Sequence, residues 1–203
     1  MGVERYWDVW HGALGSERAE RYPKAYGPPH NPVPIHRRRM ELAASLIVGN
    51  SVLDIGCGIG HLLHFVKSNV EYVGADTSPE MLRVARGAYP NNVFCVGDVY
   101  DLSSFKVFDT VLCQSVLIHL PEIETPIREM WDHTHKAMVF SIPIAHEKNV
   151  KPLHRYGNKS ILMHTTTCEN IESIVCSLDG ISDIAGYPEP ETKIDNMYIR
   201  AIK

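Results

Sequence analysis

The chain has 203 residues, of which 44% are hydrophobic and 22% are charged, with a formal net charge of −4. This length fits one domain, or one domain with a small appendage, and the composition excludes a disordered or fibrous chain. The acidic balance gives no electrostatic reason to expect a nucleic-acid partner, and the one basic cluster, residues 36–39, is expected to be a solvated helix face.

The start of the chain carries no signal for a membrane or for secretion. No apolar run is long enough to cross a bilayer, and MGVERYWDVW is charged where a signal peptide is apolar, so we expect a cytoplasmic protein. Aromatic residues are frequent over residues 1–26, and the following GPPHNPVP cannot form a regular helix. We therefore expect an N-terminal segment with a hinge over residues 1–34, and the main domain over 35–203.

The main domain alternates short apolar runs with helical patterns. After a helix over residues 35–48, strands are expected at 52–55, 71–76, 92–96, 108–113 and 137–144, with helical segments between most of them. This alternation predicts a doubly wound α/β fold with a mainly parallel sheet and helices on both faces. The runs at 180–188 and 196–203 are joined by a short connection, so they are expected to pair antiparallel.

A glycine-rich stretch, VLDIGCGIG, follows the first strand. Glycines at such a place let the backbone approach a ligand closely, and the next helical turn presents free N–H groups. A dinucleotide-binding fingerprint starting at Gly56 needs glycine or alanine at position 61, where this chain has His61. The stretch matches instead the pattern D-x-G-x-G-x-G from Asp54 to Gly60.

This pattern resembles motif I of the class I S-adenosylmethionine-dependent methyltransferases, and Asp76, Asp98 and FDTVLCQSVLIHL resemble the family's next motifs in the same order. The resemblance implies a seven-stranded sheet of order 3-2-1-4-5-7-6 with an antiparallel last strand. It also implies S-adenosylmethionine as cofactor and a small-molecule acceptor. The cofactor-binding residues that it indicates are Asp54, Gly56, Cys57, Gly58, Gly60, Asp76, Thr77, Gly97, Asp98, Val99, Gln114 and Ser115.

Other interpretations apply to several of these residues. Asp76 and Asp98 are also ordinary helix-cap or turn residues when taken singly. Cys57 is a conceivable nucleophile, but a small residue in a tight loop explains it better, and the five scattered cysteines are expected to be free thiols. His61 and His64 suggest a metal site only weakly, since no third ligand stands at a recognisable spacing, and we expect no metal.

The family resemblance also implies where the acceptor lies. His119, at the rim of the expected pocket, is either a general base or a residue that orders its loop. The stretch between Pro143 and His164 is expected to be irregular and to shape the acceptor pocket with His146, Arg155 and Tyr156. The N-terminal segment is expected to be a helical lid, with Tyr6, Trp7 and His11 facing cofactor or acceptor.

Two rival functions stay open at this point. The first is a regulatory or partner subunit that binds S-adenosylmethionine without catalysis. The second is a nicotinamide-dependent oxidoreductase, which His61 disfavours. The enzyme is expected to act as a monomer or a homodimer without a membrane partner.

Overall fold

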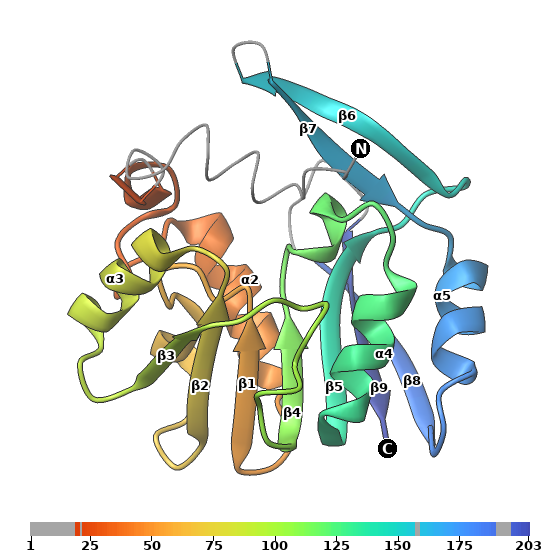
Figure 1. The fold of residues 1–203 in the computed structure, drawn as a ribbon, viewed down its shortest axis with the longest axis horizontal. Coiled ribbons are helices and arrows are strands. Elements are labelled where there is room, and N and C mark those ends of the chain that lie inside the picture. Colours follow the sequence, from red (N-terminus) through yellow and green to blue (C-terminus); the bar gives the residue numbers. More distant parts are fainter. Residues whose placement is uncertain (1–18, 21, 157–158, 190–195) are drawn as a thin grey trace.

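The centre of the molecule is a seven-stranded sheet with the order β3-β2-β1-β4-β5-β9-β8 (Figure 1). The computed structural model describes residues 19–20, 22–156, 159–189 and 196–203. The strands of the sheet are β1 (Ser51–Ile55), β2 (Glu71–Asp76), β3 (Val93–Val96), β4 (Phe108–Cys113), β5 (Thr134–Pro143), β8 (Asp183–Pro188) and β9 (Asn196–Ile202). β1 to β5 pair in parallel, whereas β9 runs antiparallel to both β5 and β8. The predicted order 3-2-1-4-5-7-6 is confirmed, with β8 and β9 as the sixth and seventh strands.

Helices cover both faces of the sheet, as the alternating pattern predicts. On one face lie α2 (Pro34–Ser45), the short 3-10 helix η1 (Leu62–Phe65) and α3 (Pro79–Ala88), and on the other lie α4 (Glu124–Asp132) and α5 (Cys168–Cys176). Val52 of β1 packs toward α2, while its neighbour Leu53 packs toward α4. Side chains of a strand alternate between faces, so a strand covered on both sides must be apolar throughout.

The basic cluster on α2 differs from its prediction. Residues 36–39 are predicted to be solvated, but His36 is only 7% exposed. His36, Met40 and Ala43 stand four and three residues apart and are all buried, so they form the helix stripe that faces the sheet. The periodicity of α2 therefore decides the position of His36 more strongly than its polarity does.

A two-stranded hairpin replaces the irregular stretch predicted after the fifth strand. β6 (Asn149–Tyr156) pairs antiparallel with β7 (Lys159–Thr165) and rises beyond the carboxyl end of the main sheet (Figure 1). Its root is joined to β5, because Thr166 N–H donates to Pro143 O over 3.1 Å and Ala145 N–H donates to Thr166 O over 2.8 Å. The prediction of an irregular segment is wrong. The pairing register of β6 and β7 shifts between Pro152 and His154, and this shift interrupts the two-residue period by which a strand is detected in a sequence.

Candidate functional site

The carboxyl ends of β1, β2 and β4 meet at one edge of the sheet. β1 pairs with β2 on one side and with β4 on the other, so consecutive connections from this point run in opposite directions. In open α/β sheets such a switch point leaves a crevice for a ligand. The glycine loop, Gly56–Gly60, follows β1 at this place.

The loop needs glycine for two physical reasons. Gly56, Gly58 and Gly60 have φ of +77°, +56° and +83°, in the left-handed region that side chains disfavour. A Cβ atom at Gly56 would also lie 2.1 Å from Cγ2 of Val116, the residue that follows Ser115 beyond β4. The loop is therefore shaped by its backbone and by close contact with the segment after β4.

Asp76, the last residue of β2, joins this loop to the start of α3. Its Oδ2 accepts a hydrogen bond from Gly58 N–H at 2.9 Å, and its Oδ1 accepts one from Ser78 N–H at 2.8 Å. The residue that caps α3 is Ser78, whose Oγ accepts from Met81 N–H. Asp76 is thus a turn residue that also holds the glycine loop, and the helix-cap role belongs to Ser78.

A cleft opens between this loop and the ends of β2 and β3. The residues that line it are Ile55, Gly56, Asp76, Thr77, Gly97, Asp98, Val99 and Val116. Six of these eight are residues that the sequence predicts to bind the cofactor. Sequence reasoning misses Ile55 and Val116. The signal that could have found them is their place in the chain, since each is an apolar residue next to a predicted site residue: Ile55 precedes Gly56, and Val116 follows Ser115. The structure therefore brings together the segments that follow four strands, β1, β2, β3 and β4, which the chain separates by about twenty residues each.

Asp54 and Cys57 lie beneath the loop rather than in the cleft. The carboxylate of Asp54 is 3% exposed and accepts a hydrogen bond from the Tyr72 hydroxyl at 2.6 Å. Burial raises the pKa of Asp54 to about 7, the Tyr72 bond opposes this rise, and the charge of Asp76 adds to it. Burial also raises the pKa of the Cys57 thiol well above its usual value, so Cys57 is not the reactive thiolate of the alternative interpretation.

The segment after β4 carries backbone strain. Ser115 has φ of +56°, which is unusual for a residue other than glycine, and its N–H donates to Ser141 Oγ on β5 at 2.8 Å. The amide nitrogen of the neighbouring Gln114 is buried and has no hydrogen-bond partner within the described part of the chain. Strained backbone and orphaned polar atoms are concentrated at ligand sites in proteins.

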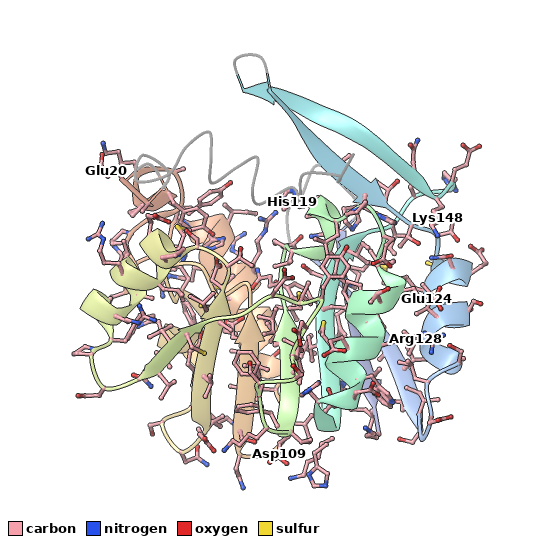
Figure 2. All side chains as sticks on the ribbon, in the orientation of Figure 1. Glu20, Asp109, His119, Glu124, Arg128 and Lys148 are labelled. Atoms are coloured by element: carbon pink, nitrogen blue, oxygen red, sulfur yellow. The ribbon has the colours of Figure 1, made fainter. Side chains whose placement is uncertain are left out.

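His119 lies on the 3-10 helix η2 (Leu117–His119), at the carboxyl end of the sheet (Figure 2). The turn is closed by a hydrogen bond from His119 N–H to Val116 O at 2.8 Å. His164 of β7 packs against the same turn: it is fully buried, and its Nδ1 lies 3.2 Å from Leu120 O. Sequence reasoning misses His164, because nothing in a polar stretch of the chain indicates which of its residues returns to η2.

The remaining predicted residues are not tested by the described part of the structure. Tyr6, Trp7 and His11 lie outside the described residues, as do the side chains of Arg155 and Tyr156 on β6. His146 is described and exposed at the root of the hairpin. The lid and the acceptor contacts predicted for these residues stay predictions.

Histidines weighed as metal ligands have other roles in the described structure. His61 is 3% exposed and hydrogen-bonds to His36 and to Gly27 O. Among the described residues, no group of three His, Cys, Asp or Glu side chains is placed to hold a metal ion. The cysteines are all free, and no described helix has the length and hydropathy of a membrane span.

Comparisons with known proteins agree with this geometry. Residues 48–185 match the family model of a methyltransferase domain. The trans-aconitate 2-methyltransferase of Escherichia coli O1:K1 / APEC is 31% identical over 91 residues, 42% of this chain and 36% of that protein. The ubiquinone biosynthesis O-methyltransferase of Shewanella halifaxensis is 30% identical over 114 residues, 53% of this chain and 48% of that protein.

The fold likeness extends over the whole chain. The crystal structure of magnesium protoporphyrin IX methyltransferase from Synechocystis PCC 6803 with bound S-adenosylmethionine has a TM-score of 0.75 and 20% identity, and covers 100% of this chain and 99% of that one. The chain matches less than half the length of the curated relatives named above. Because the family model covers well over half of the chain, from the end of α2 to β8, the chain belongs to the methyltransferase-domain family.

Proposed function

We propose that this chain binds S-adenosylmethionine at the cleft and transfers its methyl group to a small-molecule acceptor. The observation that carries the proposal is the position of the Asp76 carboxylate. It accepts a hydrogen bond from Gly58 N–H in the middle of the glycine loop, and it also lines the cleft beside that loop. Related proteins methylate small molecules according to their names, and solved neighbours of the same fold contain this cofactor.

The residues at the cleft fit such a cofactor. The left-handed glycines keep side chains away from one wall, which leaves the loop backbone open to close approach. Beside the loop, the Asp76 carboxylate suits the two hydroxyls of a ribose, and Asp98 with Val99 suits an adenine ring. We assign the methionine part to Gln114, which directly follows β4, and its buried amide nitrogen without a partner in the described part of the chain supports this assignment.

In methyl transfer, the bound cofactor supplies an electrophilic methyl carbon together with its own leaving group. The chain has to align the acceptor with that carbon and, where the acceptor atom carries a proton, to remove it. We assign proton removal to His119, because its turn is held rigidly between the end of β4 and β7. Asp54, buried below the loop, supports the loop through Tyr72 and does not contact the acceptor.

The acceptor side is formed in this proposal by η2, the root of the β6–β7 hairpin and the N-terminal residues. The described part of the N-terminal segment already lies beside the glycine loop, since Gly27 O is 2.9 Å from Nε2 of His61, the residue that directly follows Gly60. Residues before it, including Tyr6, Trp7 and His11, then close over the site as a lid. The cytoplasmic location and the state of monomer or homodimer stay predictions.

Two measurements test the proposal. Calorimetry with S-adenosylhomocysteine and with NADH is expected to show binding of the first alone, and transfer of labelled methyl groups to carboxylate, phenol and amine acceptors is expected to show turnover with one class. His119→Gln is expected to lower turnover by about 100-fold or more and to leave S-adenosylhomocysteine affinity unchanged. Binding without turnover on any acceptor would favour the non-catalytic subunit, and equal turnover in His119→Gln would leave His119 with the role of ordering its loop.

A further inference from the structure

Two buried histidines connect the N-terminal segment to the glycine loop. His61 directly follows Gly60, and His36 lies on the buried stripe of α2. Nε2 of His36 is 3.1 Å from Nδ1 of His61, and Nε2 of His61 is 2.9 Å from Gly27 O. The chain of contacts therefore runs from α2 through the end of the glycine loop to residue 27.

The direction of these hydrogen bonds follows from elementary chemistry. A carbonyl oxygen can only accept, so Nε2 of His61 carries the proton that it shares with Gly27. Nδ1 of a neutral His61 is then an acceptor, and Nε2 of His36 donates to it. Nδ1 of His36 is buried without a hydrogen-bond partner in the described part of the chain, which suits an unprotonated nitrogen. Every position in the chain of contacts is therefore consistent with two neutral rings.

The surroundings disfavour charge on either ring. The ring centroids of Tyr22 and Tyr26 lie 6.5 Å and 5.3 Å from that of His36, in an edge-on and a tilted contact, and the Tyr22 ring lies 5.9 Å from that of His61. The charged group that faces His36 is Arg39, on its own helix. Burial, followed by His61 and Arg39, lowers the pKa of His36 to about 3, and burial lowers the pKa of His61 against the opposing bonds to Gly27 and Pro28.

We propose that His36 and His61 are positioning residues that form a latch: in their neutral forms they fasten residues 27–33 to the end of the glycine loop, and acid releases this segment and weakens cofactor binding. The second anchor, the Tyr89 hydroxyl on Pro29, has no charge change near neutral pH. Acid therefore acts on the histidine anchor. This inference rests on the proposed binding of S-adenosylmethionine at the glycine loop.

The expected pH effect follows from linkage. An imidazole that is exposed when the segment opens has an ordinary pKa of about 6.5. The open form therefore binds a proton at a pH at which the latched form does not. Between pH 7.5 and pH 5.5 the opening equilibrium constant should rise about tenfold for each ring that becomes exposed. The latched form is thus favoured at the higher pH.

Hydrogen exchange reports this opening without any assay of activity. The amide of Gly27 donates to Pro23 O and that of Val33 to Tyr26 O, both at 2.9 Å, so both are protected only while the segment is folded back. Exchange of these two amides, corrected for the intrinsic pH dependence of exchange, should rise about tenfold or more from pH 7.5 to pH 5.5. The amide of Ile127 in α4, which donates to Ile123 O on the other face of the sheet, serves as the internal control. Its corrected exchange rate should not rise between pH 7.5 and pH 5.5.

Two variants separate titration from packing. His36→Gln with His61→Gln keeps a donor near each Nε2, including the one bonded to Gly27 O, with amides that cannot be protonated, so its opening should not depend on pH. His61→Leu fills the space without the bond to Gly27 and should be open at both pH values. Should the double glutamine variant fail to fold, His36→Gln alone must show a shallower rise than the native chain. A native chain whose corrected exchange is the same at both pH values, or a double variant with the native rise, would overturn the latch.

Cofactor affinity supplies the link to function. His61→Leu should bind S-adenosylhomocysteine about fivefold or more weakly than the native chain at pH 7.5, and by reciprocity the ligand should suppress exchange at Gly27 and Val33 in the native chain. Unchanged affinity in His61→Leu would remove the positioning role. If the native chain does not bind S-adenosylhomocysteine at pH 7.5, the proposed function fails, while the exchange data still decide whether the latch exists.

Discussion

The carboxylate of Asp76 and the backbone amide of Gly58 are joined by a hydrogen bond of 2.9 Å, so that the end of β2 and the middle of the glycine loop form one unit. The same carboxylate lines the cleft. A change at Asp76 therefore alters both the wall of the site and the glycine loop bonded to it.

Asp76→Asn should weaken S-adenosylhomocysteine binding by about 1.5–3 kcal/mol, because a charged acceptor of hydrogen bonds is replaced by a neutral one with half its acceptor capacity. Isothermal titration calorimetry measures the loss. Asp101→Asn, which changes an exposed carboxylate bonded to Ser103, is the matched control and should bind normally. Equal affinities in the two folded variants would remove Asp76 from the binding site.

Two of the three glycines of the loop, Gly56 and Gly58, should differ in their tolerance of alanine. A methyl group at Gly58 meets at nearest Met81 Cε at 3.5 Å, so Gly58→Ala carries only the cost of a left-handed residue, about 1–2 kcal/mol. At Gly56 the methyl group also collides with Val116, and the cost should be larger. Urea unfolding compares the two, with Gly87→Ala in α3 as a control that should not destabilise, because an added Cβ there would meet no atom within 4 Å apart from its neighbours in the helix backbone. If the Gly56→Ala protein is no less stable than the Gly58→Ala protein, the Val116 side chain can move aside without a measurable loss of stability.

Asp54 should make the stability of the protein fall as pH rises. Its pKa is raised to about 7 in the folded chain and is about 3.9 in an unfolded one. Below both values the proton is bound in both states; between them the unfolded chain releases it and the folded chain keeps it. The free energy of unfolding contributed by Asp54 is therefore lost progressively as pH rises from about 4 through about 7.

Asp54→Asn, which can still accept the Tyr72 hydroxyl, should remove that contribution, so the stability difference between variant and native chain should shift by a few kcal/mol in the variant's favour from pH 5 to pH 8. Urea unfolding at both pH values measures it. Asp109→Asn is the control: the bond from Asn50 N–H, together with His135 and Lys136, lowers the pKa of Asp109 to about 2, so this carboxyl does not itself titrate over this range and its effect should be much flatter. A flat difference for Asp54→Asn as well would mean that Asp54 is ionised in the folded chain at pH 5.

His164 should act on η2 through one of its two ring nitrogens. Its Nδ1 donates to Leu120 O, while its Nε2 is buried without a partner in the described structure. Asparagine places its amide near Nδ1 and glutamine near Nε2, so His164→Asn should keep most of the stability and His164→Gln should lose about 1–2 kcal/mol. Thermal unfolding gives the comparison, and methyl transfer should follow the same order because His119 lies on the same turn. The reverse order would assign the role to Nε2 instead.

Much of this architecture can be predicted from the chain because the signals are local. Apolar runs of strand length that alternate with helical periods indicate a doubly wound sheet, and the short connection before β9 requires an antiparallel pair. The D-x-G-x-G-x-G pattern identifies the loop, and six of the eight residues lining the cleft follow from it and from the motifs after β2 and β3. The helical period of α2 also indicates that His36 is buried, although its polarity and its place in a basic cluster predict the opposite.

Other features depend on contacts between distant parts of the chain. The sequence by itself determined the alternation of strands and helices and the place of the glycine loop, because hydrophobic period and turn chemistry act over a few neighbouring residues. The order of the strands followed only from the family resemblance that the motifs carry. The tertiary structure alone decided that Asp54 turns inward to Tyr72, that His61 meets His36 across 25 positions, and that His164 reaches Leu120 across 44. Each of these bonds exists because packing of the sheet against its helices buries a polar group that must then find a partner, and the identity of that partner depends on three-dimensional proximity rather than on sequence spacing.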